Sequence, residues 1–128
     1  PRAVRAIGDE GESAVLETKP RVLADLRDEI ARALPHVRRG MEDTVAKPYG
    51  SAHLLADLPV SVAGKTGTAQ VEENQRLNAF FVGYAPREAP QIALLVLVEH
   101  AREGSLNALP IARDVLSWYY EHRLARRR

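Results

Sequence analysis

The second half of the chain has the hydrophobic pattern of three strands followed by a helix. Residues 60–71 are rich in valine, threonine and glycine and have no helical period, and residues 77–85 and 91–100 are two further apolar runs. The polar links between these runs are short, so neighbouring strands are expected to be antiparallel. Residues 105–124 then repeat apolar side chains every three or four positions, which predicts a C-terminal helix that packs on the sheet.

The third apolar run differs from the other two. Nearly every position from Ile92 to Val98 is apolar, so neither face of this strand is marked as facing solvent. Strands with this pattern are typically covered on both faces. We therefore expect this strand to lie inside a sheet.

The first half of the chain has weaker patterns. Residues 3–7 and 13–17 are short apolar runs on either side of an acidic turn, which predicts a small hairpin. The next stretch has helical spacing, and Pro35 should divide it into a helix over residues 22–33 and a second helix that ends near Ala46. The whole pattern predicts an α+β fold, with an antiparallel sheet, helices upstream of it and one helix after it.

Composition narrows the range of functions. The chain has 128 residues, which suits one domain or part of a larger one. Its 18 lysines and arginines against 17 aspartates and glutamates give a net charge of +1, so no nucleic acid partner is expected. Without cysteine the chain has no disulfide, no thiolate nucleophile and no cysteine-metal site. The first residues, PRAVRAIGDE, look like neither a signal peptide nor a chain start, so we expect a piece of a longer protein.

The stretch VAGKTGTAQV, residues 62–71, contains two overlapping motifs. Gly64-Lys65-Thr66 ends like a phosphate-binding loop, but that motif requires a glycine five positions before Gly64, where this chain has Pro59. A phosphate-binding loop also runs from a strand into a helix, whereas the residues after Thr66 continue as strand, turn and strand. The pattern therefore disfavours nucleotide binding.

The second motif, Lys65-Thr66-Gly67, is supported by the blocks around it. VRRGMEDTV and YGSA precede it, and it is followed by NAFFVGYAP, by the apolar third strand and by PIARDVL. This ordered series resembles the C-terminal part of the transpeptidase domain of class B penicillin-binding proteins, over about residues 34–118. The similarity is greatest to the monofunctional, elongation-type enzymes of the penicillin-binding protein 2 type. It implies part of a penicillin-binding protein and serine β-lactamase-like fold.

The resemblance implies roles for the residues of this motif. A peptidoglycan stem peptide ends in a D-alanyl-D-alanine carboxylate, and β-lactams carry a carboxylate in a similar place. Lys65, Thr66 and Thr68 would bind this group through charge-assisted hydrogen bonds. Gly67 would let the substrate lie along the strand, and the backbone N–H of Thr68 would donate to the oxyanion. No cofactor and no metal is implied, and the 4 histidines share no metal-ligand spacing.

Strand geometry sets a condition on this site. In a regular strand Thr66 and Thr68 share one face, while Lys65 points to the other. All three can serve one ligand only if the strand lies at the edge of the sheet and the lysine side chain reaches round that edge.

The family's nucleophile is missing from the sequence. The family uses a serine with a lysine three residues later, then a Ser-x-Asn motif, then Lys-Thr-Gly. No serine here has a lysine at that spacing; the serines are Ser13, Ser51, Ser61, Ser105 and Ser117. Ser105 to Asn107 fits Ser-x-Asn by letter, but it follows Lys-Thr-Gly and is better explained as a helix cap. Because losing a serine nucleophile costs about a millionfold in rate, the chain alone is expected to be inactive.

The resemblance also implies partners and a location. The missing N-terminal half of the domain, or a second copy of the chain, is expected to pair with the strand over residues 91–99. The parent protein would be anchored in the inner (cytoplasmic) membrane and act on its periplasmic side, although this chain carries no anchor. Two alternatives stay open: a fragment of a serine β-lactamase or β-lactam sensor, and a noncatalytic interaction module.

Overall fold

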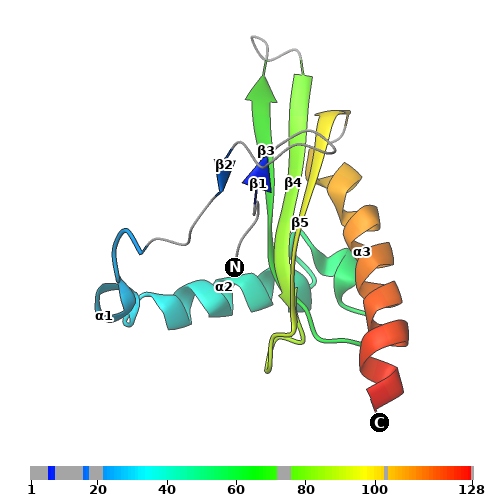
Figure 1. The fold of residues 1–128 in the computed structure, drawn as a ribbon. Coiled ribbons are helices and arrows are strands. Elements are labelled where there is room, and N and C mark those ends of the chain that lie inside the picture. Colours follow the sequence, from blue (N-terminus) through cyan, green and yellow to red (C-terminus); the bar gives the residue numbers. More distant parts are fainter. Residues whose placement is uncertain (1–5, 8–15, 18–21, 72–75, 103, 128) are drawn as a thin grey trace. The chain divides into compact units, whose positions relative to one another are not determined.

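The chain forms two compact units, Pro1–Arg32 and Ala33–Arg128. The second unit holds the sheet and the C-terminal helix expected from the second half of the sequence, together with helix α2 (Leu34–Ala46) from the first half (Figure 1). A computed structural model describes residues 6–7, 16–17, 22–71, 76–102 and 104–127.

The first unit contains a short hairpin. Strand β1 (Ala6–Ile7) pairs antiparallel with strand β2 (Leu16–Glu17), and Ile7 lies opposite Leu16. The predicted hairpin is confirmed for these residues. Its turn, and the rest of the two apolar runs, lie outside the described residues.

The helix predicted over residues 22–33 is much shorter in the structure. Helix α1 (Arg27–Ile30) is a single turn, and its residues are all exposed. Val22 and Leu23 before it are each 83% exposed. Because these side chains bury so little apolar surface, helical spacing alone does not stabilise a longer helix here.

The second unit contains a sheet of three strands, which confirms the predicted antiparallel neighbours. The strands are β3 (Ala63–Val71), β4 (Arg76–Ala85) and β5 (Ile92–Ala101), in the order β3-β4-β5. Both neighbouring pairs are antiparallel, and Val82 in the middle strand lies between Lys65 on one side and Leu95 on the other. The strands can therefore be compared position by position across the sheet.

The helical elements of the second unit lie before and after the sheet. They are α2 (Leu34–Ala46), η1 (His53–Leu55), η2 (Gly104–Asn107) and α3 (Ala108–Tyr119), which continues through η3 (Tyr120–Leu124) and η4 (Ala125–Arg127). Pro35 lies in the first turn of α2, where its missing N–H costs no hydrogen bond. Asn107 is the N-cap residue of α3, which confirms the predicted cap position. Among the described helices, none is long and apolar enough to cross a membrane.

The core lies between one face of the sheet and helix α3. On β4, Phe81 is fully buried while Val82 is 45% exposed, as side-chain alternation along a strand requires. Phe81 lies opposite Val96 of β5, and Leu109 and Leu116 of α3 belong to the same buried cluster. Figure 1 shows α3 running beside the sheet, which confirms the predicted position of the C-terminal helix.

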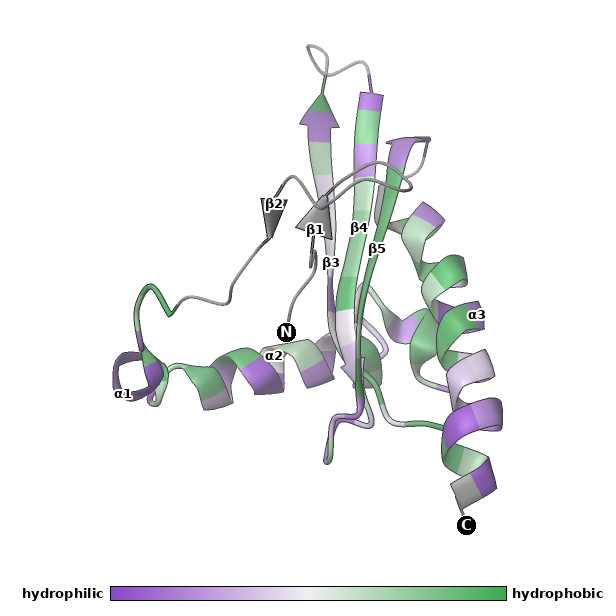
Figure 2. Cartoon of the chain, viewed as in Figure 1, coloured by the Kyte–Doolittle hydropathy of each residue, from purple (hydrophilic) through white to green (hydrophobic). Residues whose placement is uncertain are grey.

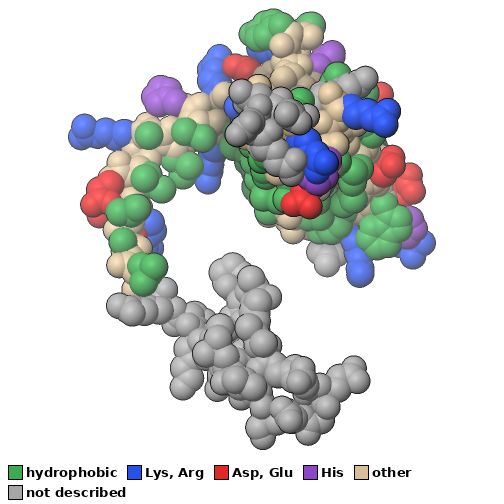
Figure 3. All heavy atoms as spheres, turned by 90° about the horizontal axis from the view of Figure 1, so that it is seen from above, with side chains coloured by type: hydrophobic (Ala, Val, Ile, Leu, Met, Phe, Trp, Pro, Cys, Tyr) green, Lys and Arg blue, Asp and Glu red, His purple; other side chains and the backbone are tan. Residues whose placement is uncertain are grey.

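The outer face of β5 remains open. Leu95 is 65% exposed and Leu97 is 45% exposed, and β4 is the single strand paired with β5 in the described part of the chain. Figure 2 shows hydrophobic colouring along most of β5, and Figure 3 shows hydrophobic side chains on the surface of this unit. The prediction that this strand lies inside a sheet is therefore wrong for this chain. The pattern correctly indicated two apolar faces, but α3 packs on only one of them.

Candidate functional site

Strand β3 carries the Lys-Thr-Gly motif at an edge of the sheet. Within the described residues, its one strand neighbour is β4. Gly64, Lys65 and Thr66 lie inside this strand and do not begin a helix, which excludes the phosphate-loop interpretation. The edge position is the condition that a single site made from Lys65, Thr66 and Thr68 requires.

The side chains of the motif leave β3 in two directions. Thr66 lies opposite the buried Phe81, whereas Lys65 lies opposite the exposed Val82 on the outer face. Thr68 shares the face of Thr66, because it follows two positions later. Thr66 is only 7% exposed, while Lys65 and Thr68 are both exposed.

The ammonium group of Lys65 nevertheless reaches the backbone of the motif. Its Nζ donates a hydrogen bond to the carbonyl oxygen of Thr66, at 2.5 Å. The cation thus lies beside Thr66, although the lysine side chain starts on the opposite face of the strand. A cation held in this place favours an anionic ligand, and its remaining N–H groups can donate to that ligand.

The backbone groups of Thr66 and Thr68 point away from β4. A Cβ built on Gly64 would lie 2.9 Å from the carbonyl oxygen of Val82, so that carbonyl is directed towards β3. Backbone groups alternate in direction along an antiparallel strand. Those of Lys65, which lies opposite Val82, therefore face β4, and those of Thr66 and Thr68 face the open edge. The Thr68 N–H points to the same edge as the carbonyl that holds the Lys65 ammonium.

Packing within the chain explains one of two glycines in β3 but not the other. A Cβ on Gly64 would lie 2.6 Å from the ring of Phe81, so packing of the core excludes a side chain there. A Cβ on Gly67 would meet the Cβ of Phe80 at 3.5 Å, which is an ordinary contact. Packing within the described chain therefore explains glycine at position 64 and not at position 67. A ligand lying along the strand would explain the second one.

Sequence reasoning missed one residue of this site, Ser51. Its Oγ lies 2.6 Å from Oγ1 of Thr66, close enough for a hydrogen bond between the two hydroxyl groups. Ser51 comes from the turn after α2, where the N–H of Ala52 donates to the carbonyl of Thr44 at 3.1 Å. The available signal was that Ser51 belongs to the YGSA block that precedes the motif, but no spacing rule links it to Thr66.

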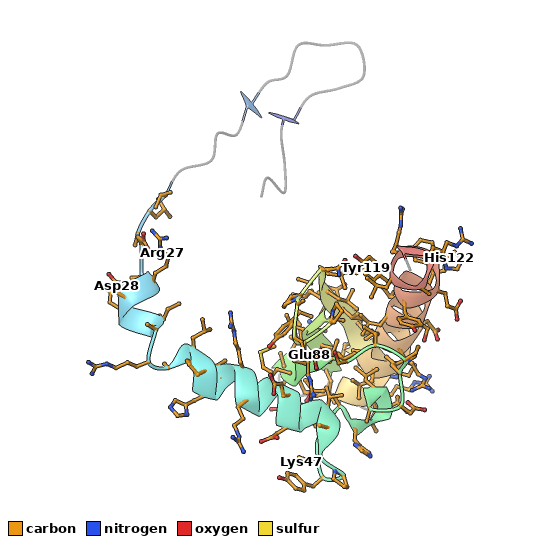
Figure 4. All side chains as sticks on the ribbon, turned by 90° about the horizontal axis from the view of Figure 1, so that it is seen from below. Arg27, Asp28, Lys47, Glu88, Tyr119 and His122 are labelled. Atoms are coloured by element: carbon orange, nitrogen blue, oxygen red, sulfur yellow. The ribbon has the colours of Figure 1, made fainter. Side chains whose placement is uncertain are left out.

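A cavity of about 340 Å³ lies away from the motif. Its lining includes Ser61, Glu88 and Tyr120 and none of the residues from Lys65 to Thr68. Hydrogen bonds from the Ser61 hydroxyl and then from the Arg87 guanidinium lower the pKa of Glu88 to about 2. Figure 4 shows Glu88, which lies in the loop between β4 and β5. This cavity does not enlarge the candidate site on β3.

The other chemical groups of the described chain do not add a second catalytic arrangement. Across the described residues, no group of three or more histidine, aspartate or glutamate side chains is placed to hold a metal ion. Trp118 is 52% exposed and stacks on His122, with ring centroids 4.6 Å apart. The chemistry of the chain therefore centres on the polar edge of β3.

The fold and the edge strand together define a class of protein. The antiparallel sheet, the C-terminal helix on one face and Lys-Thr-Gly-Thr on the edge strand agree with the resemblance to penicillin-binding proteins seen in the sequence. The family model described as "Penicillin binding protein transpeptidase domain" matches residues 10–117. The chain belongs to this family.

Individual relatives agree with the family match. The peptidoglycan D,D-transpeptidase MrdA of Haemophilus influenzae is 36% identical over 141 residues, which cover 97% of this chain and 21% of that protein. The crystal structure of Pseudomonas aeruginosa PBP2 in complex with WCK 5153 has a TM-score of 0.60 and 31% identity, over 88% of this chain and 24% of that one. PBP2 of Helicobacter pylori, solved in complex with MreC, has a TM-score of 0.62 and 30% identity, over 87% and 21%. The chain thus spans about a fifth of the H. influenzae relative.

Proposed function

We propose that residues 1–128 are the C-terminal portion of the transpeptidase domain of a peptidoglycan D,D-transpeptidase of the penicillin-binding protein 2 type. The whole protein would bind penicillin and cross-link cell-wall stem peptides through an acyl-serine intermediate. Family membership and the names of the relatives support this class of reaction. The observation that carries the proposal is the Lys65 ammonium held against the Thr66 carbonyl on an edge strand.

In this proposal, β3 binds the carboxylate of the ligand. Lys65 supplies the charge, and the hydroxyl groups of Thr66 and Thr68 supply further donors, for a D-Ala-D-Ala peptide or a β-lactam. Each charge-assisted hydrogen bond contributes about 1.5–3 kcal/mol. Gly67 leaves room for the ligand backbone to lie along the strand, where the Thr68 N–H would donate to the oxyanion. Removal of such a donor typically lowers the rate by about 10²–10³.

The nucleophile would come from a segment of the whole protein that lacks a counterpart here. No serine in the sequence has a lysine three positions later. The whole protein would act on the periplasmic side of the inner membrane, as expected for synthesis of the cell wall. Neither a metal nor a cofactor takes part in the proposed reaction.

A fluorescent penicillin tests this division of roles. We expect covalent labelling of the full-length protein that persists after the free label is removed, and no labelling of the 128-residue chain. The expected difference is about a millionfold in rate, because the nucleophile is absent from the chain. Stable labelling of the chain at any of its own serines would refute the proposal, and so would a full-length protein that is never acylated. Rapid release of the label would instead indicate a β-lactamase.

The same proposal assigns a partner to β5. The apolar outer face and open edge of this strand, over residues 91–99, would pair with the N-terminal half of the domain in the whole protein. In the isolated chain the same strand would pair with a second copy. Leu95 and Leu97 support this assignment, since both are substantially exposed and an exposed apolar edge strand favours pairing with another strand.

A further inference from the structure

The hydroxyl groups of Ser51 and Thr66 form a pair at the edge of β3. Their oxygens are 2.6 Å apart, although the residues are separated by 15 positions in the sequence. Thr66 is a buried polar residue at 7% exposure, whereas Ser51 is in an exposed turn. The turn is held to the end of α2 by the Ala52 N–H bond to Thr44 and by a 2.9 Å bond from the Gly50 N–H to the Lys47 carbonyl. The partner of Thr66 is therefore placed by α2 and not by the sheet.

We infer that Ser51 is a positioning residue that orients the Thr66 hydroxyl towards the carboxylate of the ligand, and this inference rests on the proposed function. A hydroxyl group has one proton to donate and can accept two hydrogen bonds. If Ser51 donates to Thr66, the proton of Thr66 stays free for the ligand. If Thr66 donates to Ser51, that proton is used within the protein. A carboxylate only accepts, so a bound ligand favours the first direction.

This arrangement makes a relay of two donors that ends on the ligand. A hydroxyl that accepts a hydrogen bond becomes a better donor, because the bonds of a chain polarise each other. The nearby Lys65 ammonium adds attraction for the same negative charge. Ser51 itself does not touch the ligand in this scheme, so its effect should depend entirely on the Thr66 hydroxyl.

The test is a double-mutant cycle in the full-length protein. Acylation rates by a penicillin are measured for wild type, Ser51→Ala, Thr66→Val and the double variant. We expect Ser51→Ala to slow acylation about three- to tenfold, as the typical net contribution of one hydrogen bond implies. In the Thr66→Val background the same change should have almost no effect. Ser51→Thr keeps the hydroxyl and should restore acylation.

A second measurement separates orientation from general stability. The penicillin is replaced by its carboxamide, which lacks the negative charge, and the ratio of the two acylation rates is compared between variants. Ser51→Ala should lower the ratio of the penicillin rate to the carboxamide rate by up to about three- to tenfold, because a neutral group gains less from the relay. Ser61→Ala is the matched control: it removes another hydrogen-bonded hydroxyl, away from the motif, and should leave the ratio unchanged.

The outcomes are distinguishable. If wild-type full-length protein is not acylated at all, the proposed function fails. If wild type is acylated but Ser51→Ala is slowed equally with and without the Thr66 hydroxyl, Ser51 acts on its own and the inference is wrong. An unchanged rate in Ser51→Ala, or no rescue by Ser51→Thr, also overturns it.

Discussion

The two edges of the three-stranded sheet have opposite chemistry. On β3, the exposed side chains of the motif are an ammonium and a hydroxyl, from Lys65 and Thr68. On β5, the exposed outer face presents Leu95 and Leu97. An edge with polar donors suits a small ligand that brings its own negative charge, whereas an apolar edge suits a polypeptide that buries it. The proposed function therefore assigns a different kind of contact to each edge of the sheet.

Both edge strands pack around the same buried residue of the middle strand. Phe81 of β4 lies opposite Thr66 on one side and Val96 on the other, and it is fully buried. Gly64 and Gly83 leave room for its ring, since a Cβ on either would lie under 3 Å from it. The three strands therefore share one core, and the contrast between the edges comes from side chains on the outer face, such as Lys65 and Leu95.

Replacement of the apolar edge should give the largest change in assembly. We expect Leu95→Lys with Leu97→Lys to weaken self-association of the 128-residue chain by about 2–3 kcal/mol, roughly 30- to 150-fold in Kd, through lost burial and charge repulsion. Analytical ultracentrifugation measures the Kd. The matched control is Val22→Lys with Leu23→Lys, which changes two apolar side chains of the first unit that are even more exposed. If wild type is a monomer at high concentration, or if both variants behave alike, β5 is not the contact.

Loss of the cation should have the next largest effect, and it should affect only the polar edge. Lys65→Ala in the full-length protein removes a charge-assisted hydrogen bond and should slow acylation by penicillin about 10- to 100-fold. Self-association of the 128-residue chain should not change. Lys47→Ala, at the end of α2, removes an exposed lysine of the same charge and serves as control. Equal losses in the two variants would indicate a general effect of charge instead of a binding site.

The sequence predicted the strands and helix of the second unit better than it predicted which of their faces are covered. The three strands and α3 were predictable, because alternation and helical spacing are local properties of the chain. The coverage of β5 was not, since burial depends on elements distant in sequence. The prediction of a helix over residues 22–33 was wrong for the same reason. The spacing of its apolar residues was helical, but these side chains are exposed and pack against no core.

The candidate site was also predictable only in part. Lys65, Thr66, Gly67 and Thr68 are contiguous, so a motif could nominate them as candidates, and side-chain alternation set an edge position as the condition for a single site. Ser51 was not identifiable, because its contact with Thr66 depends on how the turn after α2 folds back onto β3. Contacts between turns and strands are set by tertiary structure, which a short motif does not encode.

Substitutions at the two glycines of β3 allow core packing to be tested separately from the proposed ligand binding. Gly64→Ala forces a Cβ against the Phe81 ring and should destabilise the fold by about 1–3 kcal/mol. Gly67→Ala meets only an ordinary contact, so the unfolding temperature should hardly change, while acylation of the full-length protein should slow about tenfold if the ligand lies along β3. Thermal unfolding and labelling rates are measured on both variants. A stable Gly67→Ala protein with a normal labelling rate would show that the ligand does not lie along this part of the strand.

The smallest effect is expected where the segment before β3 meets the loop between the other two strands. The Ser61 hydroxyl and the Arg87 guanidinium lower the pKa of Glu88 from 4.5 to about 2 in the folded chain. A lowered folded pKa means that this contribution to stability is fully present above about pH 4.5 and is lost as the pH falls towards 2. Glu88→Gln should therefore flatten the fall in unfolding temperature over that range, and Ser61→Ala, which removes the main cause, should flatten it in part. If Glu88→Gln keeps the wild-type slope, the contact between Ser61 and Glu88 does not form in solution.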